Sequence, residues 1–161
     1  EIAGSRDSAN RVDKSITNEL LKQVPLLENQ STRILLVCAT NYIRQLDAAL
    51  LRPGRFDCII PVGGLNDDER LTILNYYIAR INAGDIDMQW LVENTSRFTP
   101  ADIEYLFQQV AQFAFEQELA GQKDYKVVTA TLQGILPHIR PTLTDEIIAA
   151  FEKERAKFAR V

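Results

Sequence analysis

The sequence predicts an α/β chain in which the last part of a parallel β-sheet is followed by a small all-helical lobe. Two short continuous apolar runs, at 33–40 and 58–62, are typical of strands that are buried on both faces of such a sheet. After Gly63-Gly64 the apolar residues follow helical spacing. We therefore expect two parts that meet at this glycine pair, residues 1–64 and 65–161.

The composition excludes several classes of protein. The net charge is -4 for 161 residues, and no cluster of lysine and arginine forms the basic face that nucleic-acid binding needs. No apolar run approaches the roughly 20 residues of a membrane helix, and no signal-peptide pattern opens the sequence. Cys38 and Cys58 lack the spacing of a metal site or a redox pair. We expect a cytoplasmic protein without a membrane segment, and nucleic acid is not an expected partner.

The first part should begin with a helix over 8–24, where apolar residues recur every four positions. The run 33–40 follows as a buried strand that ends at Asn41, and the run 58–62 follows as a second strand. Two strands do not make a stable sheet by themselves. Either the sequence is a fragment or its sheet is completed elsewhere.

The second part contains five expected helices, and two of them carry clear start signals. Asn66 and Glu69 form a capping box, and Thr99, Pro100 and Asp102 supply an N-cap, a proline at the first helical position and a second capping box. The core face of this second helix should consist of Ile103, Leu106, Phe107, Val110, Phe113 and Ala114. The other three helices are expected around 87–94, 129–136 and 144–158.

The motifs of a self-sufficient nucleotide-hydrolysing site are absent from the sequence. No glycine precedes a lysine that is followed by serine or threonine, as the phosphate-binding loop requires. The strongly apolar strand ends in Thr40-Asn41 and not in the Asp-Glu pair that would hold magnesium. We therefore expect that this chain alone does not bind and hydrolyse a nucleotide in the P-loop manner.

Asn41 is the first candidate for chemistry. It follows a strand that we expect to be buried, and open α/β sheets bind their ligands at the C-terminal ends of such strands. An asparagine amide both donates and accepts, so it could orient a water molecule against a phosphate. The alternative is an asparagine that merely starts the following turn.

The loop "LLRPGRFD" is the second candidate. Pro53 fixes its own φ and Gly54 permits a sharp turn, so Arg52 and Arg55 should be held on a stiff loop. A planar, permanently charged guanidinium group suits the charge that spreads over a transferring phosphoryl group. The alternative is a surface turn whose arginines pair with local carboxylates such as Asp57.

Three segments together resemble the AAA subgroup of the AAA+ ATPases, the subgroup with the second region of homology: "CATN" at 38–41, "LDAALLRPGRFD" at 46–57 and "ADIEYLF" at 101–107. The stretch "HIRPTLTDEIIAAFEKERAKF" is similar to the final helix of the Cdc48-like, proteasomal and Vps4-like members. The resemblance covers nearly the whole sequence but only the C-terminal part of the ATPase module. It implies the end of a P-loop-type parallel αβα sheet, followed by a helical lid domain.

The resemblance also implies roles for individual residues of the first part. Asn41 matches the sensor 1 position, which orients the attacking water and senses the γ-phosphate. Arg52 and Arg55 match two arginine fingers, which reach the nucleotide of the neighbouring subunit in a ring.

In the second part, Tyr77, Pro100 and Ala101 fall where relatives contact the nucleotide. Tyr77 could instead be a core aromatic residue, which is the interpretation we favour. Pro100 stands where the family usually has glycine, so any contact made by the backbone N–H of that glycine is lost. Asp102 is expected to be a cap, and the sole histidine, His138, has no partner at ligand spacing, so no metal site is expected.

The function implied by the resemblance is that of the C-terminal part of an ATP-hydrolysing ring motor that remodels or unfolds protein substrates. Such a motor uses ATP and Mg²⁺ and assembles with copies of itself, as a hexamer. The alternative is a non-catalytic scaffold or regulatory subunit that keeps the fold and the ring contacts. A nucleic-acid remodeller of the same superfamily is disfavoured by the acidic second part.

Overall fold

The computed structural model describes residues 11–27 and 34–160, which form two compact units. The first unit comprises the chain up to Pro61 together with the residues from Phe158 onward, and the second unit comprises Val62–Lys157. The division therefore falls after Pro61, close to the Gly63-Gly64 pair.

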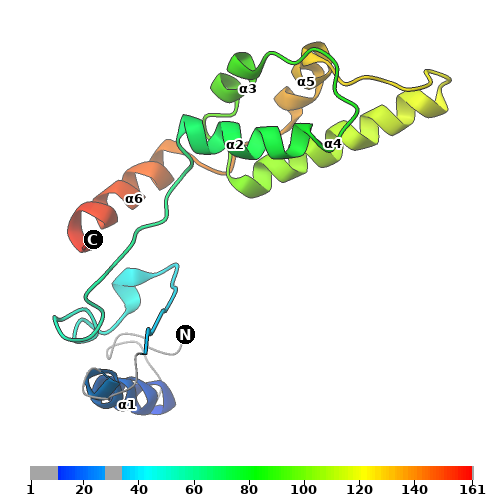
Figure 1. Cartoon of the computed structure of the whole chain (residues 1–161). Helices are drawn as coiled ribbons and strands as arrows, with labels where there is room; N and C mark the ends of the chain where they lie inside the picture. The colour runs from blue at the N-terminus through cyan, green and yellow to red at the C-terminus, as the bar shows by residue number, and fades with distance from the viewer. Residues whose placement is uncertain (1–10, 28–33, 161) are drawn as a thin grey trace. The chain divides into compact units, whose positions relative to one another are not determined.

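The first unit contains α1 (Arg11–Leu27), the short 3-10 helix η1 (Ile43–Gln45) and a long turn over residues 46–57 (Figure 1). α1 continues three residues beyond its expected end and includes Pro25. Proline lacks a backbone donor and disfavours a continuing helix, and α1 ends two residues after Pro25. The first three residues of the expected helix lie outside the described residues.

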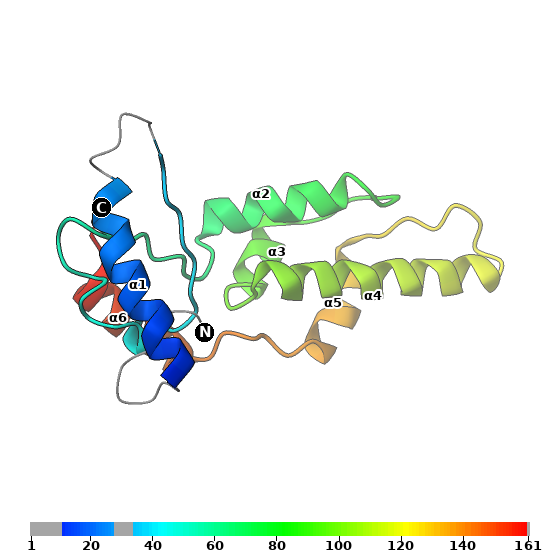
Figure 2. The same ribbon diagram turned by 90° about the horizontal axis from the view of Figure 1, so that it is seen from below.

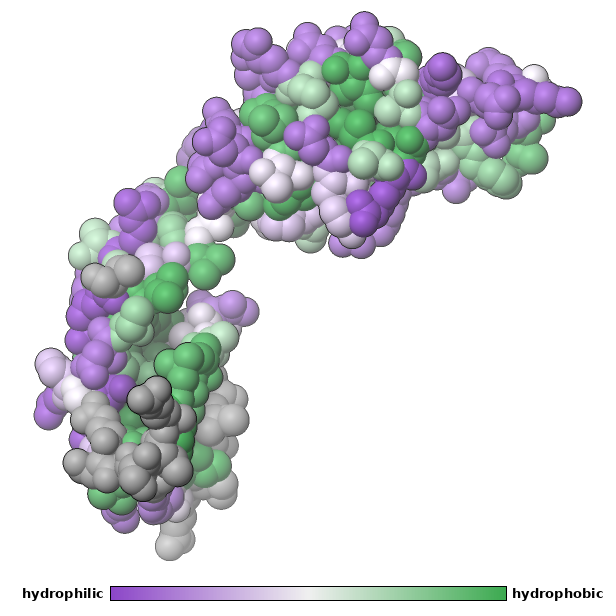
Figure 3. Space-filling model, in the orientation of Figure 1, coloured by the Kyte–Doolittle hydropathy of each residue, from purple (hydrophilic) through white to green (hydrophobic). Residues whose placement is uncertain are grey.

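The two expected strands are not formed in the described part of the chain. Residues 34–40 are extended, but no backbone hydrogen bond joins them to another described segment. Their side chains are exposed, with Leu35 86% and Val37 76% accessible, and apolar surface follows this segment in Figure 3. The prediction of strands buried on both faces is therefore wrong for this structure, because such burial requires neighbouring strands and covering helices. Arg33, the first residue of the expected strand, lies outside the described residues.

Pairing between extended segments is limited, in the described residues, to single residue pairs. In the first unit, Ile59 and Arg160 form an antiparallel bridge in which each backbone N–H donates to the other carbonyl, at 2.8 Å and 3.1 Å. In the second unit, a parallel bridge joins Ala83 and Val127. Isolated bridges of this kind fix two backbones against each other without forming a sheet.

The second unit is built from helices, as predicted. They are α2 (Asp67–Ile78), α3 (Met88–Asn94), α4 (Pro100–Leu119), α5 (Thr129–Ile135), the short 3-10 helix η2 (Leu136–His138) and α6 (Asp145–Phe158), of which the last residue belongs to the first unit. α2 and α4 lie side by side in two perpendicular views (Figure 1, Figure 2).

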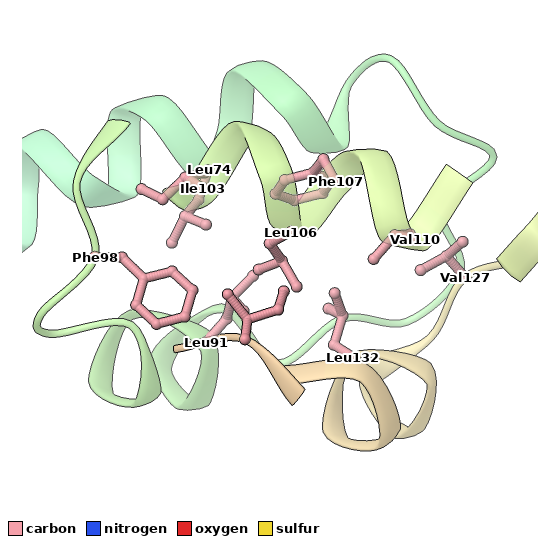
Figure 4. Packing of buried hydrophobic residues seen from close by; sticks show 10 residues of the cluster. Leu74, Leu91, Phe98, Ile103, Leu106, Phe107, Val110, Val127 and Leu132 are labelled. Atoms are coloured by element: carbon pink, nitrogen blue, oxygen red, sulfur yellow. The ribbon is translucent and has the colours of Figure 1, made fainter. Parts of the chain in front are cut away.

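α4 organises the hydrophobic core of the second unit. Of its predicted core residues, four are buried and two, Phe113 and Ala114, are half-buried. Full burial of a large apolar side chain contributes about 1.5–3 kcal/mol, so this face of α4 holds the unit together. Figure 4 shows the packed cluster, which contains Ile103, Leu106, Phe107 and Val110 of α4 together with Leu74, Leu91, Phe98, Val127 and Leu132 from the surrounding elements.

Both predicted capping boxes are present. The Asn66 side chain accepts from the Glu69 N–H at 2.9 Å, and the Glu69 carboxylate accepts from the Asn66 N–H at 2.8 Å. Asp102 forms the second box with Thr99, and it also accepts the Thr142 hydroxyl at 2.7 Å and the Thr142 N–H at 3.1 Å. Asp102 therefore fixes the start of α4 to the loop that precedes α6.

The Gly63-Gly64 pair serves close packing at the start of the second unit. A Cβ atom on Gly63 would lie 2.5 Å from the ring of Phe151, and one on Gly64 would lie 2.8 Å from a methyl group of Leu143. Any larger residue would force these side chains to move. The pair thus lets the chain pass close to two apolar side chains that lie about 80 residues later in the sequence.

We expect the exposed segment 34–40 to drive self-association of the 161-residue chain, because an extended apolar segment with unpaired backbone groups is a template for another strand. Val37→Lys should reduce the concentration dependence of the sedimentation coefficient. The matched control is Leu119→Lys, since Leu119 is 73% accessible but lies at the end of a helix whose backbone groups are mostly bonded. Equal effects of the two substitutions would contradict this expectation.

We expect Asp102→Ala to lower the free energy of unfolding of the second unit by about 1–2 kcal/mol at neutral pH, as the loss of a cap does. Partial burial by itself raises the pKa of Asp102, but hydrogen bonds from Thr99 and Thr142 outweigh it and lower the pKa below its ordinary value. Asp102 therefore stabilises the fold above about pH 4, and this contribution is lost as the pH falls through the lowered pKa.

Urea denaturation at a series of pH values measures this effect. The difference between the wild type and Asp102→Ala should shrink as the solution is acidified below about pH 4. Glu104→Ala, which removes an exposed carboxylate of the same helix, is the control and should change stability by less than about 0.5 kcal/mol. A difference for Asp102→Ala that is constant over the acidic range would count against the role of its carboxylate.

Candidate functional site

The arginine loop at 46–57 is held by hydrogen bonds from its own residues. On its N-terminal side, one carboxylate oxygen of the buried Asp47 accepts the Ala49 N–H at 2.8 Å, and the Asp47 carbonyl accepts the Leu50 N–H at 2.9 Å. Leu50 itself is 1% accessible. The loop is thus anchored by a turn and by a buried apolar side chain.

On its C-terminal side the loop is closed around Gly54, which has φ of +81°. The Gly54 N–H donates to the Asp57 carboxylate at 2.8 Å, and the Phe56 N–H donates to the Leu50 carbonyl at 3.3 Å. The predicted sharp turn at Gly54 is therefore confirmed. Asp57 binds the backbone of the turn and forms no ion pair with another described residue, so the alternative in which it pairs with the arginines is not observed.

The two arginines of this loop are used differently. Arg55 is half-buried, and its guanidinium group donates to the Ala49 carbonyl of the same loop. Arg52 is exposed; its backbone N–H donates to the Ala49 carbonyl at 3.4 Å, but its guanidinium group binds no other described residue. The loop therefore presents one guanidinium group to its surroundings and uses the other to brace itself.

Asn41 lies in the same unit, at a bend directly after the extended segment 34–40. It is exposed, and its side-chain amide binds no other described residue. The local turn bond is made by its neighbour, because the Thr40 hydroxyl accepts the Tyr42 N–H at 3.0 Å. The Asn41 amide therefore remains available to a ligand.

The three other candidates lie in the second unit. The ring of Tyr77 stacks on Phe107 with centroids 5.3 Å apart and packs against the core. Burial, together with the nearby Glu104 carboxylate, raises the pKa of the Tyr77 hydroxyl. Pro100 and Ala101 are exposed at the start of α4. Asp102 is a cap, as expected, and does not point to a ligand.

The structure thus brings Arg52 and Arg55 together on one loop and Pro100 and Ala101 together at one helix start. His138 is exposed, and no cluster of metal-ligating side chains occurs in the described residues. No helix that the structure describes is long and apolar enough to cross a membrane. Sequence reasoning missed Arg160, which contacts the arginine loop from 109 residues away and has no local signal.

We expect Gly54→Ala to destabilise the loop by about 1–2 kcal/mol, because an alanine at positive φ is strained although its Cβ would meet no atom within 4 Å. Gly134→Ala is the matched control: its Cβ also meets open space, but Gly134 lies in α5, where alanine is favoured by about 1 kcal/mol. Hydrogen exchange should report faster opening for the loop in the first variant and slower opening of α5 in the second. Slower opening of the loop in Gly54→Ala would contradict the described turn.

Comparisons with known proteins show similarity to AAA ATPases. The model of the ATPase family associated with various cellular activities (AAA) matches residues 1–63. The cell division control protein 48 homolog B of Arabidopsis thaliana is 28% identical over 94% of this chain and 24% of its own length. An ATP-dependent zinc metalloprotease, the YME1 homolog of Caenorhabditis elegans, is 37% identical over 64% of this chain and 15% of its own length.

The fold is also similar to a solved structure. The crystal structure of the FIGL-1 AAA domain superimposes with a TM-score of 0.77 at 21% identity, over 92% of this chain and 52% of that one. The chain thus spans about half of that solved domain and a third or less of the curated relatives named above. Residues 1–63 thus match the AAA family of ATPases, and the chain as a whole resembles AAA-domain proteins in sequence and fold.

Proposed function

We propose that this chain works as the C-terminal part of an ATP-hydrolysing ring motor, in which Arg52 reaches the nucleotide held by a neighbouring copy. The observation that carries the proposal is the contrast within the arginine loop. Its backbone is fixed by internal hydrogen bonds, whereas the Arg52 guanidinium group binds no other described residue. A charged group on a fixed backbone is suited to bind a phosphate group outside its own loop.

Physical chemistry favours an arginine for this task. The transferring phosphoryl group spreads negative charge over its oxygens, and a planar guanidinium group donates two hydrogen bonds to such oxygens at once. A rigid support matters because a donor that is already oriented needs no rearrangement during the reaction. Arg55 matches the second finger position of the family, but in this structure it braces the loop through the Ala49 carbonyl, so Arg52 is the main finger of the proposal.

We do not expect the residues of this chain to form a site for ATP and Mg²⁺ by themselves. The sequence has no phosphate-binding loop, and the described residues contain no cluster of metal-ligating side chains. We therefore assign to the chain the groups that act on a nucleotide bound elsewhere in the assembly. Asn41 would orient the attacking water through its available amide.

The helical second unit would serve as the lid over the nucleotide. Pro100 and Ala101 are exposed at the start of α4 and would contact the base or ribose by their apolar surface. Pro100 offers no N–H there, so this contact would rely on packing and not on a backbone hydrogen bond. Tyr77 would support the lid from the core.

The proposed assembly is a ring of six identical copies in the cytoplasm that remodels or unfolds proteins. Relatives in the comparison include an ATP-dependent zinc metalloprotease and a proteasome-activating nucleotidase of Methanococcus maripaludis. The first name refers to ATP-dependent proteolysis, and the second to a nucleotidase that activates the proteasome. A scaffold that keeps the ring contacts without hydrolysis is the competing function, and an assembled protein without ATP turnover would favour it.

The test of the proposal combines two inactive variants of the complete protein. Arg52→Ala should lower ATP turnover by about 10³–10⁵-fold while nucleotide binding persists, because the finger acts on the transition state. A second variant, disabled in the phosphate-binding loop, should neither bind nor hydrolyse ATP. When the two are mixed, turnover should partly return, since the second variant supplies Arg52 to the nucleotide of the first.

The control is Arg44→Ala, which removes another exposed arginine of the same unit and should leave turnover unchanged. Normal turnover of the Arg52→Ala protein would remove the basis of the proposal. Loss of turnover without recovery in the mixture would show that Arg52 acts within its own subunit or only on the fold.

A further inference from the structure

Arg160 makes a contact with the arginine loop that the proposed function does not use. It lies two residues beyond the end of α6, and its backbone is fixed by the two hydrogen bonds of the bridge with Ile59, at 2.8 Å and 3.1 Å. Its half-buried side chain extends to the loop, where the guanidinium group donates to the carbonyl of Leu51. A residue 109 positions away in the sequence thus holds the residue directly before Arg52.

This carbonyl belongs to the peptide group that carries the Arg52 N–H. The other end of that peptide is held weakly, since the Arg52 N–H donates to the Ala49 carbonyl at 3.4 Å, beyond the usual range of such bonds. A peptide group is planar and rotates as one body, so the hydrogen bond at its carbonyl also fixes its N–H and the following Cα atom. Arg160 is therefore the stronger of the two restraints on the backbone that aims Arg52.

Within the loop, no described group donates a hydrogen bond to the Leu51 carbonyl. In the described residues, the carbonyls of Asp47, Ala49 and Leu50 accept hydrogen bonds from within the loop, whereas the partner of the Leu51 carbonyl is the Arg160 guanidinium group. A charged donor forms a stronger bond to a carbonyl than a neutral one. The backbone bridge to Ile59 fixes the Arg160 backbone, so the side chain starts from a fixed point beside the loop.

We propose that Arg160 is a positioning residue for Arg52: by holding the Leu51 carbonyl, it sets the direction in which the Arg52 side chain leaves the loop. The proposal rests on the assignment of Arg52 as the group that acts on a nucleotide. Arg160 also follows α6 directly, and α6 up to Lys157 belongs to the helical unit. The chain runs from Lys157 through Phe158 and Ala159 to Arg160, whose guanidinium group is hydrogen-bonded to the Leu51 carbonyl.

The structural part of the proposal is tested on the 161-residue chain by hydrogen exchange. Arg160→Ala should speed exchange of the Arg52 and Phe56 amides severalfold, while the amides of α4 remain as in the wild type. Arg155→Ala is the matched control, because it removes an α6 arginine that pairs with Glu152 at 3.0 Å and does not contact the loop. Unchanged exchange in the loop, or an equal increase throughout both units, would overturn the proposal.

The functional part is tested by a double-mutant cycle in the complete protein. Arg160→Ala should lower kcat by roughly 10–100-fold with little change in KM, since a misplaced catalytic group costs rate on that order. In an Arg52→Ala background the same substitution should have no further effect on single-turnover hydrolysis. Arg160→Lys, which keeps the charge but not the planar fork, should fall between the wild type and Arg160→Ala.

The two levels of the proposal fail in different ways. Additive losses in the cycle would show that Arg160 acts only on stability and would overturn its positioning role while Arg52 remains the finger. If Arg52→Ala alone left turnover unchanged, the proposed function would fail, although the exchange experiment would still report whether Arg160 holds the loop.

Discussion

The hydrogen bonding of the backbone at 46–57 is the constraint on which the candidate site depends. Peptide groups that lack partners allow a loop to rearrange, and this loop satisfies its groups with unusually diverse donors and acceptors. The Asp47 and Asp57 carboxylates accept backbone N–H groups, while the Arg55 and Arg160 guanidinium groups donate to backbone carbonyls. Arg52 can therefore be exposed without being carried on a loose segment. An exposed guanidinium group on a hydrogen-bonded backbone distinguishes Arg52 from an arginine on a loose surface loop.

In the helical unit, too, polar side chains hold loops in place by hydrogen bonds. Asp102 caps α4 and accepts hydrogen bonds from the N–H and the hydroxyl of Thr142, so it connects the helix start to the loop before α6. An ion pair between Arg97 and Asp145, at 2.7 Å, joins the residues that flank this connection. The buried Arg70 donates to the Leu65 and Val92 carbonyls, at 3.0 Å and 3.2 Å. Polar groups thus fix the loops around the apolar cluster of the second unit.

Features that depend on neighbouring residues could be predicted from the sequence, whereas features that depend on distant contacts could not. The capping boxes at Asn66 and Thr99 and the turn at Gly54 were predictable, since each depends on partners within a few residues. The apolar run at 34–40 has the composition of a buried strand, but burial is decided by neighbouring segments that composition does not specify. Arg160 gave no signal for the same reason: its partner is chosen by the fold and not by local sequence.

The most direct test of the central claim is an experimental structure of the assembled ring with a transition-state mimic of ATP bound. In that structure the Arg52 guanidinium group should lie within about 3 Å of the terminal phosphate mimic of the neighbouring copy, the distance of a hydrogen bond. The Leu51 carbonyl should still accept a hydrogen bond from Arg160. An Arg52 side chain that points into solvent, or toward a nucleotide of its own subunit, would contradict the account.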